Sequence, residues 1–269
     1  MFFRSKVRFL ISCHIYKKNL SKETKFATVL FTDIDCAALI LMLHKEICME
    51  QASWRSKLIL VVLGIAIPLL WLIAGNATQI YLKSKHFQWH TALFGGHFLG
   101  LVLLLVIIPL YNKLPRKIEI GTLFSKSSVL PIMSVFIIYL VSTAYDLLSG
   151  THQEIWVKLM VQAPWPYAIP VFLTILVLAP LGEEIAFRGY LANAFPLEKK
   201  WGVIASAFVT ATLFSYIHFQ YAHLVSFLEI VALGFVFIWA RIRSGGLGLP
   251  IFLHFLAGVL GTASGFLLP

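Results

Sequence analysis

Long apolar segments recur along the chain from about residue 58 to its end, separated by short polar or basic stretches. Each is close to the ~20 residues that an α-helix needs to cross the hydrocarbon core of a bilayer. None shows the alternation of polar and apolar positions that transmembrane strands require. The pattern predicts an all-α, polytopic bundle of about seven transmembrane helices, at 58–74, 93–111, 129–148, 166–195, 202–221, 224–240 and 247–268.

The composition is typical of an integral membrane protein. Hydrophobic residues make up 59% and charged residues 13% of the 269 positions, and the mean hydropathy is +0.85. Soluble domains average about 45–50% apolar and about 25% charged residues, so a soluble class is excluded. The three cysteines show no CxxC spacing, which argues against a disulfide framework or a zinc knuckle. We expect the lipid bilayer to surround the chain.

The distribution of positive charge indicates how the helices are oriented. The formal net charge is +10, but Lys and Arg flank the apolar segments and form no basic patch of the nucleic-acid-binding kind. Ten basic residues stand before the first segment and after the second, fourth and sixth, against three on the other side, Lys83, Lys85 and Lys158. By the positive-inside rule the amino terminus and the even-numbered loops are cytoplasmic. We expect no nucleic-acid partner.

Residues 1–57 differ from the remainder of the chain. They carry ten basic residues and no long uncharged run, and Asp33 and Asp35 interrupt their most apolar part. Carboxylates at mid-span cost several kcal/mol, which disfavours a further transmembrane helix here. Two interpretations stay open: a loosely structured cytoplasmic extension, or sequence upstream of a start at Met49.

Two adjacent carboxylates and an arginine interrupt the fourth segment. Glu183, Glu184 and Arg188 follow an almost wholly apolar run at 171–178. Ionisable groups in a membrane segment are costly and by default mark a functional site. On a helix Glu184 and Arg188 are i and i+4 and can pair, whereas Glu183 points about 100° away. Such a pair can be purely structural, but it leaves Glu183 free for another task.

Two histidines are predicted to lie at the depth of these carboxylates. A short polar turn joins the fourth and fifth segments, which makes them antiparallel neighbours. Glu183 and His218 are equidistant from this turn and so face each other, with Phe214 one helical turn before His218. His254 lies about two turns, roughly 10 Å, into the last segment. We expect one site in the cytoplasmic third of the bilayer, with Arg188 near the interface.

A carboxylate and two histidines that converge in a mostly apolar cavity can activate water. The carboxylate can serve as a general base, and a neutral imidazole can orient the water or donate to an oxyanion. The same trio, Glu183, His218 and His254, could instead hold zinc with an open fourth position, although the sequence has no HExxH motif. A single membrane histidine more often only hydrogen-bonds a neighbouring helix. The chemical interpretation therefore depends on the three side chains meeting.

Three motifs follow one another in the second half of the chain: Glu183-Glu184-x-x-x-Arg188, Phe214-x-x-x-His218, and His254 after a glycine-rich turn and Pro250. In this order and at these separations they resemble the CPBP family of intramembrane proteases. That family includes the CAAX prenyl endopeptidase and the bacteriocin-processing and self-immunity (Abi) proteins. On this basis the chain divides into a basic extension (1–57), N-terminal membrane helices (58–164) and a CPBP-like catalytic membrane core (165–268).

The resemblance implies a role for each motif residue. Glu183 is expected to activate the attacking water together with His218. Glu184 and Arg188 are expected to support the site electrostatically, and His254 to help stabilise the oxyanion. The family is described both as metalloproteases and as glutamate-dependent proteases that work without a catalytic metal, so zinc stays open as a cofactor.

The last motif departs from the family pattern. It usually reads His-x-x-x-Asn, but Gly258 stands four residues after His254. The loss of one oxyanion donor can cost about 10²–10³-fold in rate. Thr262 is polar but lies one helical turn further on, which makes it a poor substitute.

The leading hypothesis is an intramembrane endopeptidase that hydrolyses a peptide bond near the cytoplasmic face, with Glu183 activating water. Its substrate would be a membrane-associated or lipid-modified polypeptide, or a small peptide such as a secreted signal or bacteriocin. The alternative is a non-catalytic immunity or scaffold protein that binds a peptide or partner in the membrane, and Gly258 favours it. A proton-coupled transporter using Glu183 and Glu229 predicts inverted repeats, and we find none in the sequence.

Overall fold

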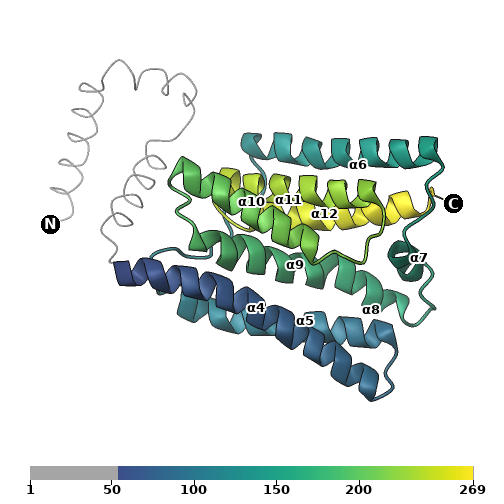
Figure 1. Cartoon of the computed structure of the whole chain (residues 1–269), viewed down its shortest axis with the longest axis horizontal. Helices are drawn as coiled ribbons and strands as arrows, with labels where there is room; N and C mark the ends of the chain where they lie inside the picture. Colours follow the sequence, from purple (N-terminus) through teal and green to yellow (C-terminus); the bar gives the residue numbers. More distant parts are fainter. Residues whose placement is uncertain (1–53, 269) are drawn as a thin grey trace. The chain divides into compact units, whose positions relative to one another are not determined.

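The computed structural model describes residues 54–268, and every regular element in this part of the chain is a helix. The predictions for residues 1–53 lie outside the described residues. Figure 1 shows the arrangement of the elements. Their bounds are α4 Trp54–Ser84, α5 Trp89–Tyr111, η1 Lys126–Ser128, α6 Val129–Ser149, α7 Ile155–Val161, α8 Ala168–Leu173, η2 Thr174–Leu178, α9 Ala179–Glu183, η3 Glu184–Leu191, η4 Ala192–Ala194, α10 Lys200–Tyr216, α11 Leu224–Ser244 and α12 Gly248–Gly265.

The predicted all-α, polytopic fold is confirmed. Six helical segments of the described chain are long and apolar enough to cross a membrane: α4, α5, η1 with α6, α8 to η4, α11 and α12. The remaining predicted segment, the fifth at 202–221, corresponds to α10, which has 17 residues and ends at Tyr216. The residues after it turn back on themselves, because the amide of His218 donates to Ser215 O and that of Tyr221 to His218 O. His218, the motif histidine of this segment, therefore lies beyond the end of α10.

The outer surface of the bundle is apolar, as a bilayer environment requires. Large hydrophobic side chains on the membrane-facing helices are widely exposed, for example Val106 at 67% and Leu140 at 70%. In water such a surface would favour aggregation, whereas in lipid it is the expected surface. With the six long apolar helices, this surface identifies an integral, multi-pass membrane protein.

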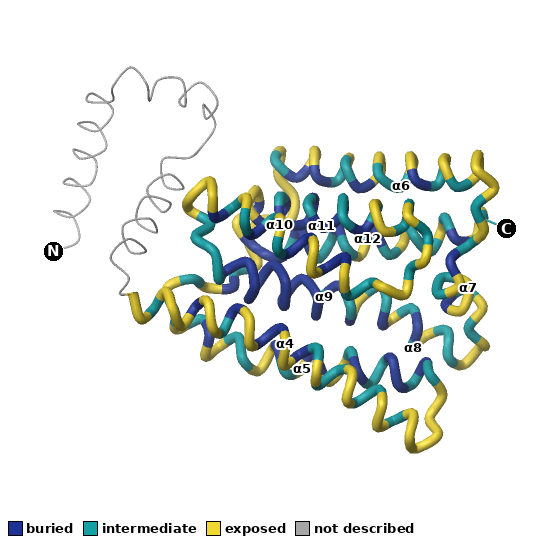
Figure 2. The backbone as a smooth tube through the Cα atoms, in the orientation of Figure 1, coloured by how far each residue is buried: buried dark blue, intermediate teal, exposed yellow. Residues whose placement is uncertain are grey.

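The fourth predicted segment is the buried centre of the bundle. Every residue at 182–193 is buried, and Figure 2 shows this stretch as the dark-blue middle of the bundle. The η3 helix packs against α4 on one side and against α10, α11 and α12 on the other. The segment is not a uniform α-helix, since η2 and η3 have π-helical geometry. Wider turns of this kind often occur at functional sites.

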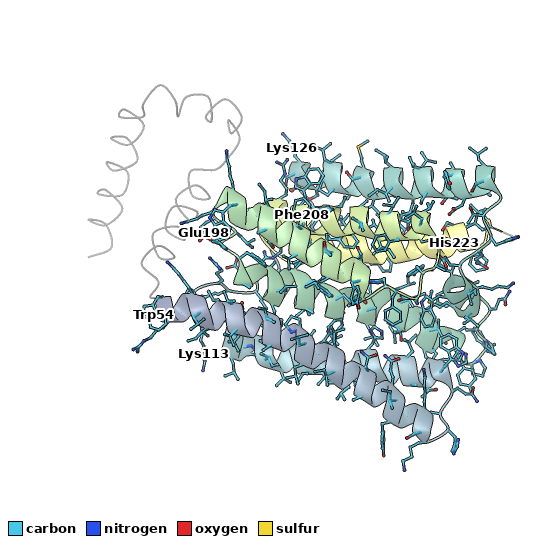
Figure 3. The ribbon with its side chains drawn as sticks, viewed as in Figure 1. Trp54, Lys113, Lys126, Glu198, Phe208 and His223 are labelled. Atoms are coloured by element: carbon cyan, nitrogen blue, oxygen red, sulfur yellow. The ribbon has the colours of Figure 1, made fainter. Side chains whose placement is uncertain are left out.

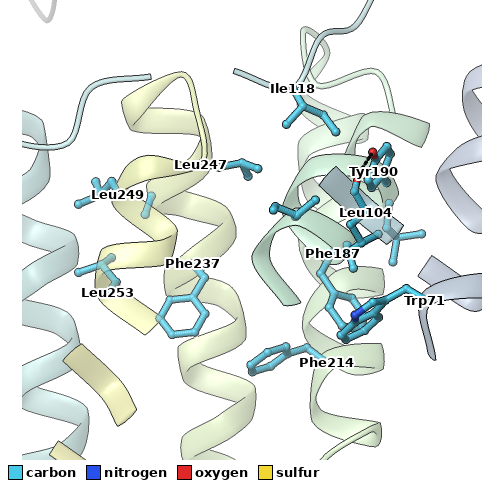
Figure 4. Packing of buried hydrophobic residues seen from close by; sticks show 14 of the residues in the cluster. Trp71, Leu104, Ile118, Phe187, Tyr190, Phe214, Phe237, Leu247, Leu249 and Leu253 are labelled. Carbon is cyan, nitrogen blue, oxygen red and sulfur yellow. Dashed lines mark hydrogen bonds between the residues drawn. The ribbon is translucent and has the colours of Figure 1, made fainter. Parts of the chain in front are cut away.

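Aromatic contacts fasten this central segment to its neighbours (Figure 4). Trp71 of α4 meets Phe187 edge to face, with ring centroids 6.2 Å apart. The Tyr190 hydroxyl donates to Leu104 O of α5 at 3.0 Å, so its polar end is satisfied inside the core. Gly64 lets α4 approach, because a Cβ there would lie 2.9 Å from Tyr190 O. The N-terminal helices thus form one side of the compartment that holds the motif residues.

Candidate active site

The Glu184–Arg188 pair lies in the buried centre of the bundle. Both side chains are 0% exposed, and Arg188 Nη1 donates to Glu184 Oε1 at 2.9 Å. Arg188 Nη2 donates to the backbone oxygen of Gly234 in α11 at 3.1 Å. A buried charge must be paired and hydrogen-bonded to be tolerated. The pair also links η3 to α11, so it helps to fix the position of the carboxylates.

Aromatic rings enclose the Arg188 guanidinium. Its Cζ lies 4.5 Å from the ring centroid of Phe214, 5.2 Å from that of Phe237 and 6.0 Å from that of Phe187. Cation–π attraction is stronger where water is excluded. Phe214 also packs edge to face against Phe187 of η3, with ring centroids 5.8 Å apart. Phe214 thus helps to hold the Arg188 guanidinium in place.

His254 shares the Glu184 carboxylate with Arg188. Its Nδ1 lies 2.9 Å from Glu184 Oε1. This oxygen already accepts a hydrogen bond from a cationic guanidinium, so Glu184 is an acceptor and His254 Nδ1 is the donor. In a neutral imidazole with Nδ1 protonated, Nε2 carries a lone pair. Glu184 therefore fixes both the ring orientation and the tautomer of His254.

Glu183 lies between the two motif histidines. Its Oε2 is 3.7 Å from His218 Nε2 and 3.8 Å from His254 Nε2. Glu183 is 6% exposed, and Oε2 has no hydrogen-bond partner among the described residues. Both separations exceed a direct hydrogen bond. The structure therefore brings the three predicted side chains together, with an unsatisfied carboxylate oxygen between two imidazoles.

His218 is held by the end of its own helix. Its Nδ1 lies 2.6 Å from Phe214 O, and a carbonyl oxygen can only accept, so the hydrogen is on Nδ1. The Nε2 atom that faces Glu183 carries a lone pair when the ring is neutral. The turn that contains His218 is fastened from outside, because the Glu154 carboxylate accepts from the amides of Ala222 at 3.1 Å and His223 at 2.9 Å.

A cavity of about 230 Å³ contains this centre. Glu183, His218 and His254 line its inner part, and its lining continues to Glu154 and His223. Figure 3 labels His223 at one end of the bundle and Lys113, Lys126 and Glu198 at the other. The cavity thus extends from the motif residues toward the end that carries α7, away from the loops rich in Lys and Arg.

Some lining residues were not singled out by the motifs. His97 of α5 lines the same cavity and lies within electrostatic reach of Glu183 and His218. Glu229 accepts a hydrogen bond from Ser142 of α6, and Tyr139 is a second hydrogen-bonding neighbour. The only sequence signal for these residues was a polar side chain inside an apolar segment.

Gly258 lines the cavity and lies close to η2 of the central segment. A Cβ at this position would lie 3.1 Å from Leu176 Cδ2 and 3.3 Å from Ile175 O. The glycine therefore lets α12 approach the π-helical η2. Thr262 does not replace the missing asparagine as a free donor, because its hydroxyl donates to Gly258 O at 2.8 Å.

Within residues 54–268, no three His, Cys, Asp or Glu side chains are placed so that they could hold one metal ion. The zinc alternative stays a prediction for metal analysis, and the chemistry below uses side chains alone.

The comparisons with known proteins concern the part of the chain that carries the motifs. Residues 164–260 match the family model described as type II CAAX prenyl endopeptidase Rce1-like. An uncharacterized 24.3 kDa protein of Escherichia coli is 42% identical over 108 residues, which are 40% of this chain and 50% of that protein. The chain thus covers half the length of this curated relative. No solved structure gives a significant match.

Proposed function

We propose that this chain, a member of the CPBP family of CAAX-type proteases by its residues 164–260, is an intramembrane endopeptidase. It hydrolyses a peptide bond of a membrane-associated or lipid-modified polypeptide, or of a small peptide. The observation that carries the proposal is the unpartnered Oε2 of Glu183, which lies 3.7 and 3.8 Å from two imidazole nitrogens inside a cavity. An enclosed base of this kind is suited to activate water.

Glu183 is the general base of the proposed reaction. It takes a proton from a water molecule while the hydroxide oxygen attacks the carbonyl carbon of the scissile bond. The bare Nε2 of His218, fixed by the hydrogen bond of Nδ1 to Phe214 O, orients that water as a hydrogen-bond acceptor. The proton then passes to the leaving amine nitrogen when the C–N bond breaks. General acid–base catalysis of this type contributes about 10²–10⁴-fold in rate.

His254 stabilises the charge that develops on the substrate oxygen. Because Nδ1 donates to Glu184, His254 can also donate from Nε2 only as an imidazolium. The Glu184 carboxylate, which is paired with Arg188, holds the His254 ring through Nδ1 at 2.9 Å, so Nε2 is the atom that faces the substrate oxygen. A donor fixed before the reaction in a dry site is the usual means of stabilising an oxyanion.

We further propose that the amino terminus faces the cytoplasm and that substrates enter from the opposite side. The first part follows from the positive-inside rule. The second follows from the cavity, whose lining runs from Glu183 to Glu154 and His223 at the end remote from the basic loops. This differs from the cytoplasmic catalytic side expected from the sequence alone, because the sequence did not show where the cavity extends.

The direct test uses purified protein in liposomes and a library of short apolar peptides, with cleavage products identified by mass spectrometry. Glu183→Gln and His218→Ala are expected to lower the rate by about 10³-fold or more. Glu198→Gln is the matched control. This carboxylate lies outside the cavity and forms an ion pair with Arg116, with 3.1 Å between Arg116 Nη2 and Glu198 Oε1. Unchanged proteolysis in Glu183→Gln would end the assignment. Metal analysis, with rates measured with and without chelator, tests the zinc alternative on the same samples.

A second candidate is a non-catalytic immunity or scaffold protein that binds a peptide in the same cavity. Gly258 favours it, because the family asparagine is missing and the nearest hydroxyl, Thr262, is already used. This candidate predicts that Glu183→Gln leaves the cellular phenotype and peptide binding unchanged. The protease predicts loss of the phenotype in a protein that still inserts into the membrane.

A further inference from the structure

We infer that the cavity binds a cationic group of its substrate, an Arg or Lys side chain or a free amino group, beside Glu229 and Asp146. The inference rests on the proposed function, since it names the substrate chemistry of the same site. It follows from the charges that line the cavity, from the partners of each carboxylate, and from the cost of leaving such charges without a cation.

The lining of the cavity is acidic in a strongly basic chain. The formal net charge is +10, yet no Lys or Arg is among the described residues that line the cavity. Four carboxylates are: Asp146, Glu154, Glu183 and Glu229. A cavity lined by one sign of charge between low-dielectric walls concentrates ligands of the opposite sign. The fixed charges that line the cavity are therefore negative, whereas the net charge of the whole chain is positive.

These carboxylates form a connected series. Tyr221 lies within electrostatic reach of Glu229, Glu183 and Glu154, and Glu229 lies within reach of Asp146. The series thus runs from the proposed base toward the outer end of the cavity. A peptide that reaches Glu183 from that end passes the other carboxylates on its way.

The carboxylates differ in whether their charge is already compensated. Glu154 accepts from the amides of Ala222 and His223 at the start of α11, where a negative charge is favourable. Within residues 54–268, the hydrogen-bonding neighbours of Glu229 are the neutral hydroxyls of Ser142 and Tyr139. Among the described residues, neither Glu229 nor Asp146 forms an ion pair with Lys or Arg.

Two buried oxygens point to a missing partner. Oδ1 of Asp146 and Oε2 of Glu183 are both buried without a hydrogen bond from any described residue, and Glu183 as a whole is 6% exposed. A buried charge without a counter-ion costs several kcal/mol; the cost is smaller for Asp146, which lies in the last turn of α6 and has Thr151 as a hydrogen-bonding neighbour, than for Glu183. A substrate ammonium or guanidinium would remove part of this cost, so cationic substrates should bind more tightly than neutral ones of the same shape.

Binding is tested separately from catalysis. The full-length Glu183→Gln protein in nanodiscs is titrated with an acetylated, amidated heptapeptide of leucine and alanine that has one central arginine. The matched probe has citrulline, which is similar in shape but uncharged, and a third probe is the citrulline peptide with a free amino terminus. We expect the arginine peptide to bind at least about tenfold more tightly than the acetylated citrulline peptide, as for a partly desolvated ion pair.

The variants assign the preference to residues. Adding Glu229→Gln is expected to reduce the ratio of the affinities for the arginine and citrulline peptides to about twofold or less. If that variant does not fold, Asp146→Asn is used in its place, with the same expected result. Glu198→Gln, outside the cavity, should leave the ratio unchanged. A higher affinity of the free-amine probe would identify an amino terminus as the preferred cation.

The inference is overturned if arginine and citrulline peptides bind equally, if no peptide binds, or if the ratio survives the loss of both Glu229 and Asp146. Its failure is distinguishable from that of the proposed function. Cleavage of both peptides at equal rates by the unmodified protein would support a protease and refute the charge preference.

Discussion

Glu184 and His254, which are 70 positions apart in the sequence, are joined by a 2.9 Å contact between Oε1 and Nδ1. The same oxygen accepts from Arg188, so one carboxylate balances a guanidinium and orients an imidazole. Glu184 is therefore a positioning residue, and its effects on stability and on rate are separable.

The first prediction separates these two effects. Glu184→Gln leaves the wholly buried Arg188 without a counter-ion and should destabilise the protein by about 3–5 kcal/mol. Glu184→Leu combined with Arg188→Met removes both charges and should recover much of that stability while the rate stays low, because His254 has lost its orienting partner. Thermal unfolding in detergent and kcat are measured for each variant. A double variant with full activity would contradict the positioning role of Glu184.

The second prediction concerns the turn that carries His218. Glu154→Ala leaves the amides of Ala222 and His223 without their acceptor, which should cost about 1–3 kcal/mol. A small displacement of His218 should also lower kcat by tenfold or more. Glu198→Ala, which removes a partly exposed carboxylate, is the control and should change stability by less than about 0.5 kcal/mol. Equal effects of the two substitutions would show that Glu154 does not fix the turn.

The third prediction concerns His97, which no motif includes. His97→Leu should lower kcat by about tenfold with little change in KM, because this imidazole lines the cavity within reach of Glu183 and His218. His97→Gln retains a hydrogen-bonding group and should recover part of the rate. His86→Leu, in the exposed loop after α4, is the matched control. A change in KM alone would assign His97 to binding.

The fourth prediction concerns Gly258. Gly258→Asn restores the family residue but places a Cβ 3.3 Å from Ile175 O, so we expect a loss of about 1 kcal/mol from overpacking and no gain in kcat. Gly258→Ala, which adds the Cβ without the amide, separates crowding from hydrogen bonding. An increase in kcat of about 10²-fold for asparagine but not alanine would instead identify the missing oxyanion donor.

The fifth prediction concerns orientation. In a variant whose three cysteines, Cys13, Cys36 and Cys48, are replaced by serine, His152→Cys, in the exposed loop between α6 and α7 that lines the cavity, should react with a membrane-impermeant thiol reagent added outside intact cells. Lys113→Cys, at the opposite end of the bundle, should react only after the cells are opened. Labelling in the reverse pattern would place the cavity on the cytoplasmic side.

The local features of the site could be predicted from the sequence. The Glu184–Arg188 pair follows from spacing on one helix, and the approach of Glu183 to His218 follows from their equal distance from a short turn. Both depend on neighbours in a single hairpin, where position along the chain determines depth. The all-α membrane fold likewise follows from the length and polarity of the apolar segments.

The tertiary structure alone decided what meets across helices that are distant in the sequence. Spacing gave no sign that His254 bonds Glu184, that His97 enters the cavity, or that Ser142 and Tyr139 are the partners of Glu229. Nor did it show the π-helical geometry of η3, or the end of the bundle toward which the cavity extends. The physical reason is that side-chain periodicity indicates which groups avoid lipid, whereas the partner of each buried polar group depends on how the helices rotate and pack together.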